Sequence, residues 1–252
     1  FKPVLLNDVV KLVLTCPNKQ CKLDPIPTWL VKRCLSEVAP ILSALVNKSL
    51  TTECIFPTEL KKSIVTPILK KSSLPADSVE NYRPVSSVPF ISKIIEKAVV
   101  WQLTQHMERG GYLSKFQSAY RKAHSTETAL LRIVNDVIAA VGDGALAMVA
   151  VLDMSAAFDT VDHSILITKL DRLYGVRGGV SKLLSSYLKG RCQTVDVDGE
   201  SSGMPMDCGV PQGSVLGPLL FTLYTNDLES TVLMNGTSYY SYADDILLCR
   251  FC

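Results

Sequence analysis

The sequence predicts an α+β protein, because segments with helical spacing come first and strands mixed with helices follow. Within residues 1–55, apolar side chains such as Leu30 and Leu35 recur at helical intervals. Beyond residue 140, apolar or alternating runs end at carboxylates or turns. With 252 residues, the chain can bury a core as one large domain or as two lobes.

The first half is predicted to hold two extended segments between helices. Prolines interrupt the helices of residues 1–55, at Pro25, Pro27 and Pro40. Residues 63–69 are short and β-branched, which is typical of a strand, and a polar loop follows at 72–80. Pro84 disfavours a helical conformation at Arg83, so residues 81–85 are expected to be extended.

Two amphipathic helices should follow. Apolar positions recur at helical spacing over residues 90–108. Ser125 is a suitable N-cap, with Glu127 in the first turn of a helix that ends before Gly142-Asp143-Gly144.

The second half alternates strands and helices. Residues 145–152 are wholly apolar and end at Asp153, which predicts a buried strand with a carboxylate at its tip. Further strands are expected at 193–198, turning at Asp198-Gly199, and on both sides of Ala243-Asp244-Asp245 within 239–248. Helices are expected at 164–174, 178–189 and 214–228.

Charge is distributed unevenly along the chain, although the net charge is only +2. Residues 1–140 hold 19 Lys or Arg against 11 Asp or Glu, and residues 141–252 hold 7 against 13. A basic half can bind a polyanion and an acidic half can bind divalent cations. Chance surface charge explains the same asymmetry equally well.

The sequence argues against a membrane-spanning segment and against a cysteine zinc site. The uncharged stretch 208–226 approaches the length of a membrane span, but Pro211, Gly213 and Pro218 within it indicate a loop and a helix start. The eight cysteines lack the paired spacing of a zinc site, and they are expected to be reduced thiols of an intracellular protein.

Three carboxylates carry the chemical hypothesis. Asp153 ends one apolar strand, and Asp244 and Asp245 lie at a turn between two others. Neighbouring strands would bring the three together, and such a cluster can hold two Mg²⁺ ions roughly 3.5–4 Å apart for phosphoryl or nucleotidyl transfer. The alternative is structural, since Asp-Asp is a common exposed turn dipeptide.

Five motifs, in order, resemble those of reverse transcriptases from LINE-type, non-LTR retrotransposons, and most closely the group that includes the L2, CR1 and jockey elements. Two segments resemble the fingers motifs. They are Asn81-Tyr82-Arg83-Pro84-Val85-Ser86, and Phe116-Gln117-Ser118-Ala119-Tyr120-Arg121 with His124-Ser125-Thr126-Glu127-Thr128. Three segments resemble the palm motifs: Val151-Leu152-Asp153-Met154-Ser155-Ala156-Ala157-Phe158-Asp159-Thr160-Val161-Asp162-His163, Gly209-Val210-Pro211-Gln212-Gly213-Ser214-Val215-Leu216-Gly217-Pro218 and Tyr242-Ala243-Asp244-Asp245. Lys122-Ala123 departs from the family, which usually has a Pro-Gly turn there.

The resemblance implies a right-hand polymerase fold that is truncated before the thumb, with an antiparallel palm sheet backed by helices. A helical N-terminal extension is expected at 1–58, fingers at 59–142 and palm at 143–252, and residues 177–200 could return to the fingers side. The implied activity is an RNA-directed DNA polymerase that uses an RNA template, a DNA primer and deoxynucleoside triphosphates. Two Mg²⁺ ions, with Mn²⁺ as a substitute, and a nuclear location with a cytoplasmic ribonucleoprotein stage are implied as well.

The resemblance also assigns roles to individual residues. Asp153 and Asp244 would bind the metals directly, with Asp245 beside them and the Met154 carbonyl as a further oxygen ligand. Phe158 would be a steric gate against ribonucleotides. Arg121 and Lys122 would contact the template backbone. The incoming nucleotide would be bound by Lys70 or Lys71, Arg83, Phe158, Gln212 and Gly213.

Two rival hypotheses remain. A decayed or truncated element would keep the fold, bind nucleic acid and catalyse nothing. An RNA-templated RNA polymerase could share the palm, although Phe158 argues against ribonucleotide use.

Overall fold

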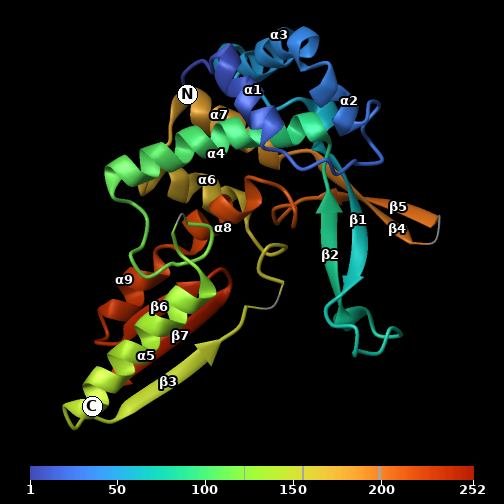
Figure 1. Ribbon diagram of the computed structural model, residues 1–252. Helices are drawn as coiled ribbons and strands as arrows, with labels where there is room; N and C mark the ends of the chain where they lie inside the picture. Colours follow the sequence, from blue (N-terminus) through green and yellow to red (C-terminus); the bar gives the residue numbers. More distant parts are fainter. Residues whose placement is uncertain (122, 155, 198–199) are drawn as a thin grey trace.

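The computed structural model describes residues 1–121, 123–154, 156–197 and 200–252. The expectations for Lys122 and for a turn at Asp198-Gly199 therefore lie outside the described residues. Helices come first and two β-sheets follow, so the predicted α+β class is confirmed (Figure 1).

The helices gather mainly in one part of the molecule, where α1, α3, α4 and α7 lie above α6 and α8 in Figure 1. They are α1 (Leu6–Leu14), α2 (Thr28–Arg33), α3 (Leu35–Asn47), α4 (Phe90–Gly110), α5 (Thr126–Gly142), α6 (His163–Arg172), α7 (Gly178–Leu188), α8 (Gly217–Thr225) and α9 (Leu228–Leu233). Short helical turns occur at η1 (Lys48–Thr52), η2 (Thr58–Lys61) and η3 (Val79–Asn81).

The first sheet has four strands in the order β2-β1-β4-β5. They are β1 (Lys62–Leu69), β2 (Tyr82–Ser87), β4 (Arg191–Val197) and β5 (Glu200–Met206). The hairpin of β1 and β2 is antiparallel, and β4 joins β1 in parallel, with Lys62 opposite Cys192. The hairpin of β4 and β5 thus extends the sheet begun by β1 and β2, although more than a hundred residues separate the two hairpins.

The second sheet has three antiparallel strands in the order β3-β7-β6, as the prediction of an antiparallel palm sheet requires. They are β3 (Ala147–Leu152), β6 (Ser238–Tyr242) and β7 (Asp245–Phe251). Helix α5 lies along this sheet and contacts β3 and β6 (Figure 1). Its N-cap is the predicted one, because the Ser125 hydroxyl accepts a hydrogen bond from the Thr128 N–H at 3.2 Å, and the Thr128 hydroxyl accepts one from the Ser125 N–H.

One large apolar core holds the helices together. Helix α4 contacts α1 and α3, and α6 contacts α7 and α8. The α4 side chains Ile94, Ile95 and Ala98 are fully buried in this core. Burial of an apolar face is the main source of stability for a helix in a protein, so α4 is the central helix of this core.

Three local expectations are corrected. Strand β3 is not buried, since Val151 is 67% exposed, because it is an edge strand and no described element packs over its outer face. Helix α5 buries only Ile133 of its apolar residues, because just one side of it meets β3 and β6. Pro40 does not interrupt a helix but lies inside α3, where core contacts of Ala39 and Leu42 outweigh one missing hydrogen bond.

Across the described residues, every helix is too short or too polar to cross a membrane.

Candidate active site

Strand register brings the predicted carboxylates to one edge of the three-stranded sheet. Leu152, the last residue of β3, lies opposite Ile246 of β7, and Tyr242 lies opposite Asp245 across the turn between β6 and β7. Asp153 follows Leu152 directly, so it leaves the sheet beside the turn that holds Asp244 and Asp245. Asp153 and Asp245 are exposed and Asp244 is half-buried.

A cavity of about 600 Å³ lies between this sheet edge and the other sheet. The three carboxylates contribute one wall, and the side chains of the β1–β2 hairpin contribute another. Seven of the predicted site residues line it: Lys70, Arg83, Asp153, Phe158, Gln212, Asp244 and Asp245. Segments that are far apart in the chain therefore meet around one space.

The charges around this cavity are complementary to a metal-bound polyphosphate. Lys70 and Arg83 are exposed on the hairpin of β1 and β2, and the Asp residues lie on the sheet edge. The hairpin is held in shape by its own bonds, such as the Lys70 N–H to the Asn81 carbonyl at 2.8 Å. An Arg fork and a Lys point charge both suit phosphate oxygens, whereas carboxylates suit divalent cations.

Phe158 has two environments. Its ring stacks on Phe221 of α8 with centroids 4.9 Å apart and an interplanar angle of 24°, so one side belongs to the core. The residue also lines the cavity and is half-buried. A ring fixed by the core on one face can present a rigid edge to a ligand on the other.

The loop that holds Gln212 is fastened from both sides. The Gln212 carbonyl accepts a hydrogen bond from the Ser86 N–H of β2 at 2.7 Å, and the Val210 N–H donates to the Phe158 carbonyl at 2.8 Å. The loop therefore ties the first sheet to the segment after β3.

Gly213 is needed for this packing and does not itself line the cavity. It has φ +120°, and an added Cβ would lie 2.4 Å from the Ser86 carbonyl oxygen. The close approach that glycine permits here is thus toward β2. A contact of Gly213 with the nucleotide stays a prediction.

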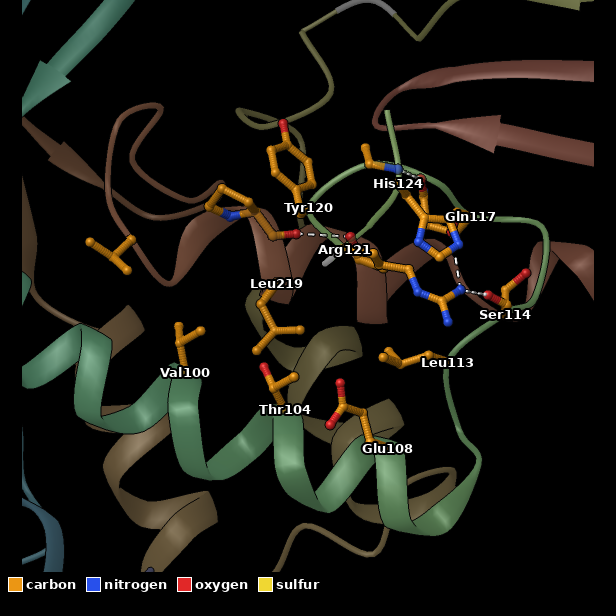
Figure 2. Close-up of a pocket in the computed structure, with 14 residues that line it drawn as sticks. Val100, Thr104, Glu108, Leu113, Ser114, Gln117, Tyr120, Arg121, His124 and Leu219 are labelled. Atoms are coloured by element: carbon orange, nitrogen blue, oxygen red, sulfur yellow. Dashed lines mark hydrogen bonds between the residues drawn. The ribbon is translucent and has the colours of Figure 1, made fainter. Parts of the chain in front are cut away.

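Arg121 lies in a different cavity, of about 450 Å³, between α4, α8 and the loop before α5 (Figure 2). Its Nη1 donates to the carbonyls of Ser114 at 2.5 Å and Gln117 at 3.1 Å. These bonds brace the loop, and contact with the template backbone stays a prediction for Arg121. Lys122 lies outside the described residues.

The donor set fits a hard divalent cation, since three carboxylates line one cavity and oxygen is the ligand that Mg²⁺ prefers. Across the described residues, no three His, Cys, Asp or Glu side chains are close enough to form a ready-made metal-binding group.

Sequence reasoning missed three residues near the acids. Asp159 lines the cavity, and partial burial raises the pKa of its carboxyl. Burial and the nearby charge of Asp244 raise the pKa of Tyr120. Gln117 contacts the turn before Asp244 through its side chain. All three belong to the quoted motifs, so motif membership is the signal by which the sequence could have identified them.

An antiparallel sheet with carboxylates at one edge, facing a basic hairpin across a cavity, is the arrangement expected of the right-hand polymerase fold. The comparisons agree: residues 68–250 match the family described as reverse transcriptase (RNA-dependent DNA polymerase). The chain belongs to this family.

Curated relatives specify the group. The chain is 33% identical over 90% of its length to the RNA-directed DNA polymerase from mobile element jockey of Drosophila melanogaster, and 31% identical over 98% to the probable RNA-directed DNA polymerase from transposon BS of the same species. These matches confirm the resemblance to jockey-like non-LTR elements. The chain spans 25% and 28% of the length of these two relatives.

Among solved structures, apo telomerase from Candida tropicalis shares the fold. The similarity has a TM-score of 0.53 at 13% identity and covers 84% of this chain and 49% of the telomerase chain. It supports the fingers and palm architecture alone.

Proposed function

We propose that this chain is the polymerase part of an RNA-directed DNA polymerase from a jockey-like non-LTR element. It adds deoxynucleotides to the 3′ end of a DNA primer on an RNA template and releases pyrophosphate. The observation that carries this proposal is the cavity in which Asp153, Asp244 and Asp245 meet Lys70 and Arg83.

Two Mg²⁺ ions, with Mn²⁺ as a substitute, are proposed to bind at Asp153, Asp244 and Asp245, with the Met154 carbonyl as a further ligand. When bound, such ions lower the pKa of the primer 3′-hydroxyl and neutralise charge on the triphosphate. The half-buried position of Asp244 supports a ligand role, because a partly desolvated carboxylate gains more from a cation than an exposed one.

The incoming deoxynucleotide is proposed to lie between the acids and the β1–β2 hairpin. Arg83 grips phosphate oxygens with its fork, and Lys70 adds a point charge. Phe158 presents its ring edge to the sugar and excludes a 2′-hydroxyl, and the Gln212 amide bonds the nucleotide. Supporting this arrangement, all four residues line the cavity that holds the acids.

The RNA template is proposed to contact the fingers side through Arg121 and Lys122. The excess of basic residues in the first 140 positions supports a nucleic-acid surface there. As the polymerase of a mobile element, the protein is proposed to be intracellular, in the nucleus with a cytoplasmic ribonucleoprotein stage, and a fluorescent fusion would test this location.

Primer extension on an RNA template with Mg²⁺ tests the activity. We expect Asp244→Asn to reduce deoxynucleotide addition on the order of 10³-fold, because a lost metal ligand removes several kcal/mol of transition-state stabilisation. Asp143→Asn is the matched control, since Asp143 lies at the C-cap of α5 and not on the cavity. Equal extension by the wild type and Asp244→Asn would refute the assignment of Asp244.

The alternative of an inert remnant gives a different result. Such a chain would bind an RNA–DNA duplex with strong salt dependence and would extend no primer at any Mg²⁺ concentration. Intact carboxylates around a formed cavity favour the active enzyme.

A further inference from the structure

The turn that holds Asp244 has an unfavourable backbone conformation. Ala243 has φ +55°, in the left-handed region that residues with a Cβ rarely adopt. The turn is tight, because Tyr242 and Asp245 on its two sides pair directly. The pairing of Tyr242 with Asp245 across a two-residue turn favours this conformation, and hydrogen bonds from a neighbouring group stabilise it further, since strained residues persist where their surroundings fix them.

The loop between α4 and α5 supplies that group. It docks on β6 through two backbone hydrogen bonds, from the Ser118 N–H to the Ser241 carbonyl at 2.9 Å and from the Ser241 N–H to the Phe116 carbonyl at 3.0 Å. Gln117 lies between these two bonds and pairs with Ser241 as an isolated bridge. The loop thus lies beside the end of β6, immediately before the turn, and pairs with it at a single parallel bridge.

The Gln117 side chain holds both peptide groups of Ala243. Its Oε1 accepts hydrogen bonds from the Ala243 N–H at 3.3 Å and the Ala119 N–H at 2.9 Å, and its Nε2 donates to the Ala243 carbonyl at 3.5 Å. The carbonyl of Ala243 and the N–H of Asp244 belong to one peptide plane. One amide therefore fixes the plane from which the Asp244 side chain projects.

Burial makes this contact specific. Gln117 is 5% exposed, so a side chain without matching donor and acceptor would leave polar backbone groups of the turn unsatisfied. Arg121 supports Gln117 in turn through its bond to the Gln117 carbonyl, and Figure 2 shows both residues on the same loop.

We infer that Gln117 is a positioning residue that aims Asp244 at the metal site. The inference rests on the proposed function, because it assigns Asp244 as a metal ligand. Gln117 does not line the cavity that holds the acids, and it acts through the conformation of Ala243. Partners that orient a metal ligand commonly set metal affinity by 10- to 100-fold, on the order of the effect expected here.

The test compares Mn²⁺ binding, followed by electron paramagnetic resonance, in the wild type and in Gln117→Leu. We expect the dissociation constant for Mn²⁺ to rise about tenfold, and the Mg²⁺ concentration for half-maximal primer extension to rise in parallel. Gln117→Met fills the same space with a more flexible chain, and it replaces the Leu variant if that variant does not fold.

Asn226→Leu is the matched control. Asn226 clasps the other end of the same loop, with its amide bonded to the Tyr112 carbonyl at 2.9 Å and the Ser114 N–H at 3.0 Å. We expect this variant to lose thermal stability while Mn²⁺ affinity stays within about twofold, because it leaves the Ala243 contact intact. Equal loss of affinity in the Gln117 and Asn226 variants, or unchanged affinity in Gln117→Leu, would overturn the inference.

Asp244→Asn separates this inference from the proposed function. If Mn²⁺ binding depends on Asp244 and on Gln117 but no primer is extended, the polymerase proposal fails and the positioning role stands. Mn²⁺ binding that is indifferent to Asp244→Asn would overturn the positioning role as well.

Discussion

Leu103 of α4 and Leu131 of α5 illustrate how differently two regions of this molecule are packed. Leu103 is 2% exposed inside the core that joins the helices, whereas Leu131 is 70% exposed on the helix that lies along the β3-β7-β6 sheet. Among the described residues, the cluster beneath that sheet has Ile133, Tyr240 and Cys249 as its buried members. The helical core therefore supplies most of the stability, and the sparsely packed sheet presents the carboxylates.

The difference explains how the acids are held. Few apolar contacts hold the sheet edge, so its conformation depends more on specific hydrogen bonds from neighbouring segments. The loop around Gln117 is hydrogen-bonded to β6, next to the turn that holds Asp244. The loop around Gln212 is hydrogen-bonded to β2 and to the segment after β3. Polar contacts of this kind define a geometry more sharply than apolar packing, which is non-directional.

The largest effect on stability should come from truncating Leu103, with Leu131 as the exposed counterpart. We expect Leu103→Ala to lower the free energy of unfolding by about 2–5 kcal/mol, because it leaves a cavity in the core. Leu131→Ala should change it by less than about 0.5 kcal/mol, as exposed positions usually do. Urea unfolding of both variants measures the contrast, and comparable losses would show that the sheet region is packed as firmly as the core.

Phe158 lies at the border of the two regions. We expect Phe158→Ala to raise ribonucleotide incorporation relative to deoxynucleotide incorporation on the order of 10- to 100-fold, since removing the ring admits a 2′-hydroxyl. Primer extension with each nucleotide type measures the ratio. Phe221→Leu is the control for lost core packing, because it removes the stacked aromatic partner and keeps the Phe158 ring itself. Unchanged discrimination in Phe158→Ala would remove the gate role and reopen the RNA polymerase hypothesis.

Helix α5 offers a smaller test of the sheet region. Ser125→Ala removes the capping box of α5 and should cost about 1 kcal/mol. Thermal unfolding measures the loss. Ser185→Ala, inside α7 and not at its cap, serves as the control and should be neutral or slightly stabilising. A silent Ser125→Ala would mean that α5 draws its stability from its contacts with the sheet alone.

The smallest effect concerns pH at the cavity. Burial raises the pKa of the Asp159 carboxyl in the folded chain, so ionising it costs stability as the pH rises above its unfolded value of about 3.9. Asp159→Asn should therefore raise the free energy of unfolding near pH 7 by less than about 1 kcal/mol, seen as a slightly higher melting temperature. The gain should vanish near about pH 3. Asp77→Asn, in the loop between β1 and β2, is the control. A gain that persists in acid would assign the effect to packing.

Local patterns in the sequence determined much of the fold. The β-branched run at 63–69, the helix at 90–108 and the Ser125 cap were all predicted, because side-chain spacing and capping act within a few residues. The motifs also identified the acids at strand ends, and the register of β3, β6 and β7 brings them to one sheet edge.

Only the tertiary structure decided the remaining features, because each depends on which distant segments meet. The apolar run before Asp153 predicted a strand, but burial requires a covering layer, and β3 is an exposed edge. The parallel pairing of β1 with β4 and the hydrogen bonds of Gln117 to Ala243 likewise join residues more than a hundred positions apart. Sequence thus specified the chemical groups, and long-range packing set the direction in which they point.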